Sequence, residues 1–391
     1  MRLTAALLLL LGSPALASPL AERIDRLAAA AEPRVIEARR HLHQNPELSN
    51  REVETAAYVA RRLRQLGLTV ETGIARHGVV ATLRGGRPGR SVALRADMDA
   101  LPVTEEVDLP FKSTRRSTFD GQEVGVMHAC GHDAHTAILL GAAEVLSALR
   151  DELPGTVHFI FQPAEEGAPA GEEGGAERMV AEGVLARAPA PEAIFGLHVF
   201  PQYEVGQVGW RRGGVLASSD NLDITVHGRQ THGAYPWQGV DPIVVASQIV
   251  LGLQTVASRQ MDISRAPVIV TIGKIEGGVR QNIIPEQVRM KGTLRALDPE
   301  MRLQLHEKVR RTVEQIAASA GARAEVAIGT DHAYPVTVND AALTTQLLPT
   351  LQRVVGAGLV EARPVLGAED FSFFAERIPG LYLSLGIRTP G

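Results

Sequence analysis

The chain has 391 residues, of which 45% are hydrophobic and 21% are charged, a composition typical of a globular protein large enough for two domains. Its 40 Lys and Arg residues against 44 Asp and Glu residues give a net charge of −4, which provides no basic footprint for nucleic acid or anionic lipid. The single cysteine, Cys130, excludes an intramolecular disulfide bond. Its thiol is therefore a buried filler, a nucleophile or a metal ligand.

The N-terminal residues have the pattern of a secretory signal peptide. One positive charge, Arg2, precedes the apolar run 3–11, and an Ala-x-Ala ending follows. We therefore expect cleavage between Ala17 and Ser18, and export to the periplasm or the extracellular space. The apolar run is too short to cross a bilayer, and no later stretch reaches the required length, so we expect no membrane anchor.

After this segment, helical patterns alternate with short apolar runs. This alternation predicts an α/β layer with a largely parallel sheet. The expected helices are 20–42, 51–66 and 134–149, and the expected strands are 79–83, 91–96, 156–161 and 193–197.

The pattern changes after Trp210. A strand (222–227), a helix (241–256), two strands (268–275 and 287–297), a helix (299–320) and a strand (324–328) are expected in that order. This order is that of a ferredoxin-like α+β domain. Helix and strand signals resume over 341–385, so the second domain is predicted to be inserted into the first. We expect a signal peptide at 1–17, a catalytic domain at 18–210 plus 329–391, and a lid at 211–328.

Polar side chains gather at the ends of several expected strands. In an open α/β sheet, ligands collect at the carboxyl ends of the strands, so these side chains should converge in one cleft. They are Asp97, Asp99, Glu165, Glu166 and His198, together with Cys130 and His132 in the segment HACGHDAH (128–135).

This inventory of a thiol, imidazoles and carboxylates suits borderline divalent metals such as zinc, cobalt, nickel and manganese. Metal-assisted hydrolysis needs one carboxylate to hold the ion and another to take a proton from water. The adjacent Glu165 and Glu166 at a strand end can divide these two tasks.

Each signal also has a simpler interpretation. Taken alone, Cys130 fits a small buried residue, Glu165 and Glu166 fit a solvated acidic loop, and His198 fits a core histidine. We interpret His158 and His306 as structural. The sharpest rival function is cysteine-nucleophile hydrolysis, which needs a thiol at a helix terminus close to a histidine. The sequence does not exclude this chemistry. A cysteine nucleophile, however, leaves the carboxylates at the strand ends unexplained.

Seven motifs occur in order along the chain: RHLHQNPEL (40–48), LRADMDALP (94–102), HACGHDAH (128–135), QPAEEG (162–167), GLH (196–198), NIIP (282–285) and EDF (369–371). Together they resemble the dinuclear metal-dependent amidohydrolases related to hippurate hydrolase, indole-acetyl-amino-acid hydrolase and aminoacylase-type metallopeptidases. The resemblance runs from about Arg34 to Gly386. It implies an α/β catalytic domain of the phosphorylase/hydrolase-like type with an inserted lid.

The resemblance also implies roles for particular residues. It assigns the metal ligands to Cys130, His132, Glu166 and His198, with the cysteine bridging two ions. It implies that Glu165 is the general base, with Asp97 and Asp99 beside the metal centre as supports. The catalytic set implied by the resemblance consists of Glu165, Asp99 and the lid histidine His232. In a dimer, His232 would reach a substrate site across the interface. Asn282 would contact the substrate near the tetrahedral intermediate.

The implied cofactors are two divalent ions, manganese, zinc, cobalt or nickel. Family members usually carry a further histidine, in a His-x-Pro-like segment after the region equivalent to 383–386, which serves the second metal. This sequence has no histidine after His332. We therefore expect either a catalytic domain incomplete at its C-terminal end or another group in that position, and the occupancy of the second site stays open.

The resulting prediction is an exported amidohydrolase that cleaves the amide bond of N-acylated amino acids, hippurate-like or similar small conjugates. Water activated by the metal, with Glu165 as base, would attack the carbonyl carbon. The expected partners are this small substrate and a second copy of the chain, joined through the lid. The alternatives are a carboxypeptidase or dipeptidase on the same scaffold, or a non-catalytic metal-binding relative.

Overall fold

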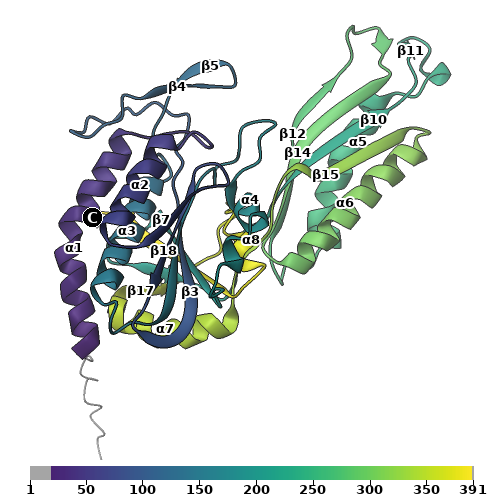
Figure 1. Cartoon of the computed structure of the whole chain (residues 1–391). Helices are drawn as coiled ribbons and strands as arrows, with labels where there is room; N and C mark the ends of the chain where they lie inside the picture. The colour runs from purple at the N-terminus through teal and green to yellow at the C-terminus, as the bar shows by residue number, and fades with distance from the viewer. Residues whose placement is uncertain (1–18, 390–391) are drawn as a thin grey trace, which may run out of the picture.

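The computed structural model describes residues 19–389, so the predicted signal peptide lies outside the described residues. Its larger part is built on an eight-stranded, mainly parallel sheet (Figure 1). The strands lie in the order β1 (Thr69–Ile74), β2 (Gly78–Arg84), β6 (Pro154–Gln162), β3 (Arg87–Asp97), β7 (Ile194–Glu204), β18 (Gly380–Arg388), β8 (Val208–Trp210) and β17 (Leu359–Glu361). Parallel pairing joins β6, β3, β7 and β18, and also β8 and β17.

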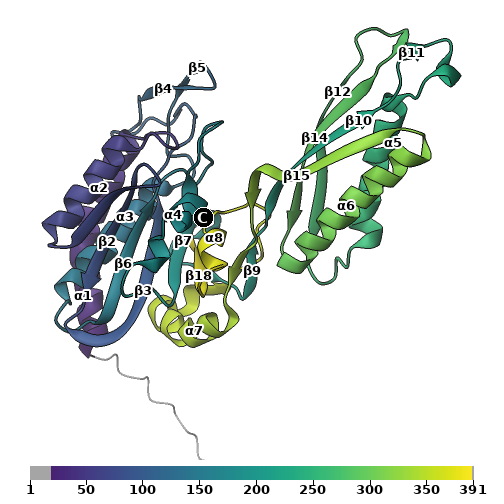
Figure 2. The same ribbon diagram turned by 45° about the vertical axis from the view of Figure 1, so that its right-hand side comes forward.

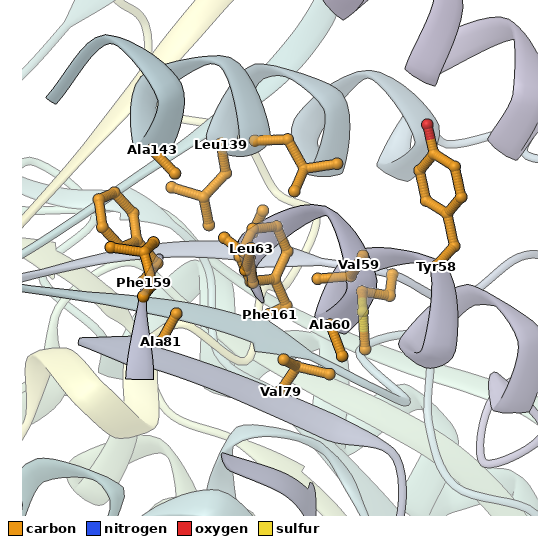
Figure 3. Packing of buried hydrophobic residues seen from close by; sticks show 14 of the residues in the cluster. Tyr58, Val59, Ala60, Leu63, Val79, Ala81, Leu139, Ala143, Phe159 and Phe161 are labelled. Atoms are coloured by element: carbon orange, nitrogen blue, oxygen red, sulfur yellow. The ribbon is translucent and has the colours of Figure 1, made fainter. Parts of the chain in front are cut away.

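The core of this part lies between the sheet and a layer of three helices, α1 (Pro19–Gln44), α2 (Val53–Gln65) and α3 (His132–Ala148). Figure 3 shows Phe159 and Phe161 of β6 packed beneath Leu139 of α3 and beside Leu63 of α2. Both phenylalanines are fully buried, and each contributes about 1.5–3 kcal/mol by leaving water. Ile160, between them, points to the opposite face and is buried there too. Burial on both faces explains the unbroken apolar run of this strand.

A second unit carries its own antiparallel sheet, with strand order β12-β14-β10-β15. In chain order its elements are β10 (Ser219–His227), α5 (Pro242–Thr255), β12 (Val268–Gly277), β14 (Gln287–Ala296), α6 (Pro299–Ser319) and β15 (Arg323–Tyr334). This is the strand-helix-strand-strand-helix-strand order expected for a ferredoxin-like unit. The fold class predicted from the sequence is therefore confirmed, while the domain boundaries stay predictions.

Helix α6 illustrates why these segments fold as they do. The side chain of Asp298 accepts a hydrogen bond from the backbone N–H of Met301, and Pro299 occupies the first turn. The buried side chains follow at intervals of four residues and form one stripe that packs on the sheet. They are Met301, Leu305, Val309, Val313 and Ala317.

The two units are joined through a narrow region of extended chain. Strand β9 (Gly213–Leu216) pairs with β16 (Thr337–Asn339), and the chain enters β10 and leaves β15 directly beyond them (Figure 2). Two short helices, α4 (Gly175–Ala181) and α8 (Ser372–Ala375), lie on the side of the large sheet that faces the second unit (Figures 1 and 2).

The remaining elements are short, apart from one helix. Helix α7 (Ala341–Val355) belongs to the larger part, and the hairpin β4 (Arg116–Phe119) and β5 (Gln122–Gly125) projects from it. Strands β11 (Thr231–His232) and β13 (Ile283–Ile284) pair in the second unit. Across residues 19–389, the helices lack the combination of length and apolarity needed to cross a bilayer.

Candidate metal centre

The structure brings the strand-end residues together at one edge of the large sheet. Asp97 ends β3, and Glu165 and Glu166 lie just beyond β6. His132 is the first residue of α3, and Cys130 precedes it by two positions. His198 differs from expectation, because β7 continues to Glu204 and the histidine lies within the strand rather than after it.

Two histidines present the same ring nitrogen to a common space. The Nδ1 atom of His132 lies 3.3 Å from Oδ1 of Asp99, while its Nε2 atom is buried and has no hydrogen-bond partner among the described residues. His198 donates from Nδ1 to its neighbour's carbonyl oxygen at 2.7 Å, and its Nε2 atom lies 3.3 Å from Sγ of Cys130. Fixing Nδ1 in this way leaves the Nε2 lone pair available to a metal ion.

His135 lies beside them, but both of its ring nitrogens already form hydrogen bonds within the protein. Its Nδ1 atom donates to Oδ1 of Asp97 at 2.7 Å, and its Nε2 atom accepts from the backbone N–H of Val199 at 2.9 Å. Both ring nitrogens are therefore engaged. His135 is a support of the cluster and not a ligand, although it stands in the same motif as His132.

Among the described residues, four groups of donor atoms could hold a metal ion, and two of them contain no residue whose donor atoms are all engaged elsewhere. The donor atoms of Cys130, His132 and His198 lie within 4.8 Å of one another, and so do those of His132, Glu165 and Glu166. His132 is common to both groups. A thiol, imidazole nitrogens and carboxylates, around a buried nitrogen that lacks a partner, fit a divalent cation of the zinc type.

Without a metal ion, the environment of the cluster favours the protonated forms of several of its side chains. Burial opposes a charge on His132, but the carboxylates of Asp97 and Asp99 outweigh it and raise the pKa of the imidazole well above its ordinary value. Burial raises the pKa of the Cys130 thiol and that of the Glu166 carboxyl. Burial and two neighbouring carboxylates raise the pKa of Glu165 well above its ordinary value. A bound cation would displace such protons, so metal binding should be strongly pH-dependent.

Asp99 connects most of the members of the cluster. Its carboxylate accepts from the backbone N–H groups of Glu165 and Glu166, each at 3.0 Å, and from the Ser49 hydroxyl at 2.7 Å. Burial alone would favour the neutral acid, but the hydrogen bond to His132 and these further contacts lower the pKa of Asp99. The carboxylate therefore orients both glutamates and one histidine.

Sequence reasoning missed the role of Arg95. This guanidinium is fully buried and contacts Asp97 and Asp370 at 2.8 Å and Glu369 at 3.0 Å. The donor atoms of Glu165, Glu369 and Asp370 also lie within 4.8 Å of one another, but Arg95 already supplies the positive charge there. The available signal was a charged residue inside an otherwise apolar strand.

The two site residues predicted in the second unit, His232 and Asn282, do not join the cluster. His232 lies in β11, exposed, and pairs across to Ile283, next to the exposed Asn282. Its Nδ1 atom accepts from the backbone N–H of Ala234 at 3.1 Å. Figures 1 and 2 both show β11 at the end of the second unit that is distant from the large sheet.

Comparisons with known proteins agree with this geometry. The sequence profile of the family described as "Peptidase family M20/M25/M40" matches residues 93–391, well over half of the chain. The chain therefore belongs to this family of hydrolases.

Individual relatives are similar over most of their length. "Thermostable carboxypeptidase 2" of Saccharolobus solfataricus is 41% identical over 371 residues, which cover 95% of this chain and 90% of that protein. "N-acetyl-L-cysteine deacetylase" of Bacillus subtilis is 38% identical over 356 residues, or 91% of this chain and 80% of the relative.

A solved structure of the Bacillus subtilis protein YXEP, described as a dinuclear metal binding peptidase from the M20 family, is also similar. It has a TM-score of 0.77 and 37% identity, and the match covers 92% of this chain and 89% of that one. The chain is thus a metal-dependent hydrolase of amide or peptide bonds, as the motifs predicted.

Proposed function

We propose that this protein hydrolyses the amide bond of N-acylated amino acids. The observation that carries the proposal is the pair Glu165 and Glu166, whose carboxylates each lie 3.8 Å from the same free Nε2 atom of His132. One carboxylate can hold a cation while the other handles a proton. The relative named as a deacetylase of an N-acetyl amino acid supports this substrate class.

In this proposal Cys130, His132, Glu166 and His198 hold two divalent ions of the manganese, zinc, cobalt and nickel group. Such ions supply Lewis-acid activation of water and of the substrate carbonyl when bound. The chemistry of the donors supports this ligand set, since Cys130 and the two Nε2 atoms lie within bonding reach of a shared space.

Glu165 is the proposed general base. It takes a proton from the attacking water as the oxygen–carbon bond forms, and it delivers that proton to the nitrogen as the carbon–nitrogen bond breaks. The products are a carboxylic acid and a free amino acid. Burial and the carboxylates of Glu369 and Asp370 raise the pKa of Glu165, which favours its delivery of a proton to the nitrogen. The positive charge of a bound cation would lower this pKa towards the range that a base needs.

The test is Glu165→Gln, which keeps the shape of the side chain and removes its basicity. We expect unchanged metal content by elemental analysis, and turnover of hippurate and N-acetyl amino acids lowered by about 10²–10⁴-fold. Glu173→Gln is the control, because this nearby acid is exposed and pairs with Arg178. Turnover at the parent rate in Glu165→Gln would refute the assignment of the base.

Carboxypeptidase activity is the second candidate, and the 41% identity to a thermostable carboxypeptidase favours it. A panel of N-acyl amino acids and unblocked dipeptides, assayed under the same conditions, separates the two. A higher kcat/KM for peptides than for every acyl-amino acid would replace the first proposal.

We also propose a homodimer through the second unit. Large apolar side chains are exposed there, including Trp237, Leu251 and Val279, at 74%, 71% and 91% of their full surface. In such a dimer, His232 and Asn282 would serve the partner's site. Light scattering at assay concentrations should give twice the mass of the chain, and a monomer would refute the proposal.

Export is proposed from the N-terminal sequence pattern alone. In an expression host, the protein should accumulate outside the cytoplasm with Ser18 as its first residue. Mass spectrometry of the purified chain tests this, and an intact N-terminus in the cytoplasmic fraction would refute it.

A further inference from the structure

The turn that carries Glu165 is strained. Ala164 has φ +54°, a left-handed conformation that is costly for a residue with a Cβ atom. Such conformations persist only where the surrounding structure holds them in place. The contacts that hold this turn therefore also determine where the Glu165 side chain lies.

Three side chains bind the main chain of this turn. A carboxyl oxygen of Glu52 accepts from the N–H of Ala164 at 2.8 Å, and Asp99 accepts from the two N–H groups that follow. On the other side, the hydroxyl of Tyr334 donates to the carbonyl oxygen of Glu165 at 2.7 Å. The peptide units on both sides of the Glu165 Cα atom are thus fixed, one of them by Tyr334.

Tyr334 comes from a different part of the molecule than the other two. It is the last residue of β15, the strand by which the chain leaves the second unit, and it pairs with Ser219 at the start of β10. Its ring packs edge-on against Phe373 of α8, in the larger part, with ring centroids 6.0 Å apart. It therefore sits on the junction between the two units.

The pairing of β15 is interrupted just before this residue. Asp220 pairs with Ala333 but Leu222 pairs with Ile328, so β15 contains extra residues opposite a short step of β10. The irregularity includes Gly329, which has φ +67°. A bulge of this kind is a point at which a strand bends, so the second unit can change its direction on one side of Tyr334.

The geometry points to Tyr334 as a positioning residue for Glu165. Its hydroxyl ties the main chain of the proposed base to the junction, so the orientation of the second unit sets the placement of the Glu165 carboxylate. This inference rests on the proposed function, because it needs Glu165 as the base. It assigns no contact with substrate to Tyr334 itself.

The first test is Tyr334→Phe, which keeps the ring against Phe373 and removes only the hydroxyl. We expect kcat for an N-acyl amino acid to fall about tenfold to a hundredfold, because displacement of a reacting group by 1 Å costs on that order. We expect KM within twofold and unchanged metal content. The control is Tyr203→Phe, whose half-buried ring lies at the end of β7 and should leave kcat unchanged.

The melting temperature separates positioning from general stability. Tyr334→Phe should melt within about 3 °C of the parent. A loss of more than about 10 °C, or an unfolded variant, would overturn the inference, because the hydroxyl would then support the fold rather than the base. An unchanged kcat, or a change confined to KM, would overturn it as well.

A double-mutant cycle tests whether the hydroxyl acts through Glu165. In the Glu165→Gln background, Tyr334→Phe should lower the residual rate by less than twofold. The amide introduced at position 165 cannot act as a base, so displacing it removes no further catalysis. A further tenfold loss there would overturn the inference. Failure of the proposed function is recognised separately, because in that case Glu165→Gln alone would retain the parent rate.

Discussion

Arg95 and Asp370 are joined by a hydrogen bond of 2.8 Å, although 275 residues separate them in the chain. The same guanidinium contacts Asp97 and Glu369, so three buried carboxyl groups share one buried cation. Because Asp97 also lies 3.8 Å from Nδ1 of His132, the charge of Arg95 is coupled through Asp97 to a proposed metal ligand.

Replacing Arg95 by Met should therefore be severely destabilising. It removes the guanidinium that three buried carboxyl groups share, and breaking a buried ion pair in this way costs about 3–5 kcal/mol. The free energy of unfolding from urea titrations measures the loss. The control is Arg90→Met, because Arg90 pairs with Glu192 at the surface, where the cost should be about 0–1 kcal/mol. Similar losses for the two variants would contradict the role given to Arg95.

His43 should make stability depend on pH in a defined direction. Its ring nitrogens lie 2.9 Å from Asp133 and 3.2 Å from Glu105, and the hydrogen bond to Asp133, against the effect of burial, raises the pKa of the imidazole. A histidine with a raised folded pKa stabilises the fold fully below its unfolded pKa and loses that contribution as pH rises through the folded value. His43→Gln should cost about 1.5–3 kcal/mol near pH 6 and progressively less towards pH 9.

His41, on the same helix, is the opposite-sign control. Burial, with Arg61 as the next cause, lowers the pKa of its imidazole. Protonation therefore destabilises the folded state, and the cost disappears as pH rises through the unfolded pKa. Relative to His41→Gln, the parent should gain stability as pH rises to about 7. Denaturant titrations across pH 5.5–9 would contradict both assignments if the two variants followed the same trend.

Gly131 should be required for the loop that carries Cys130. Its φ is +96°, and an added Cβ atom would lie 2.2 Å from Cγ2 of Val199, the residue that binds His135. Gly131→Ala should cost about 2–4 kcal/mol, from the left-handed backbone and the steric overlap together, and should also weaken metal binding. Gly121→Ala is the matched control, because its φ is +76° with no neighbouring atom within 4 Å. Thermal melting and metal titration should separate the two variants, and equal losses would show that the overlap at Val199 is relieved at no cost.

Cys130 should contribute to metal affinity rather than act as a nucleophile. Cys130→Ala removes the sulfur that lies 3.3 Å from Nε2 of His198, so we expect metal content after dialysis to fall to half or less. His158→Gln is the control, since His158 bonds Thr82 and a backbone carbonyl far from the cluster. Chelators should abolish turnover in the parent. Activity that survives chelation but is lost on alkylation would instead support a thiol nucleophile.

Several features of the fold and the site could be predicted from the sequence. The apolar runs of β3 and β6 and the periodic pattern of α6 depend on local burial, which a pattern of side chains records directly. The convergence of Glu165, Glu166 and His198 follows from the rule that parallel strands end at one edge of the sheet.

Other features depend on pairings that no local pattern encodes. Nothing near Arg95 indicates that its partners lie 275 positions further on. The difference between His132 and His135 depends on one backbone N–H, that of Val199, which occupies the second nitrogen of His135. Equally, the length of β7 beyond His198 depends on its pairing with β18, a strand that the sequence placed only within a broad segment.

The position of β18 between β7 and β8 has a consequence for biosynthesis. During translation, β3, β6 and β7 leave the ribosome long before β18, which pairs with β7. Arg95 in β3 is likewise made long before its partners Glu369 and Asp370. The ferredoxin-like unit, whose four-stranded sheet is built only from strands within 219–334, can fold during that interval. The nascent chain should therefore expose an unpaired edge of β7 until β18 has been made, and that edge is open to binding by a chaperone.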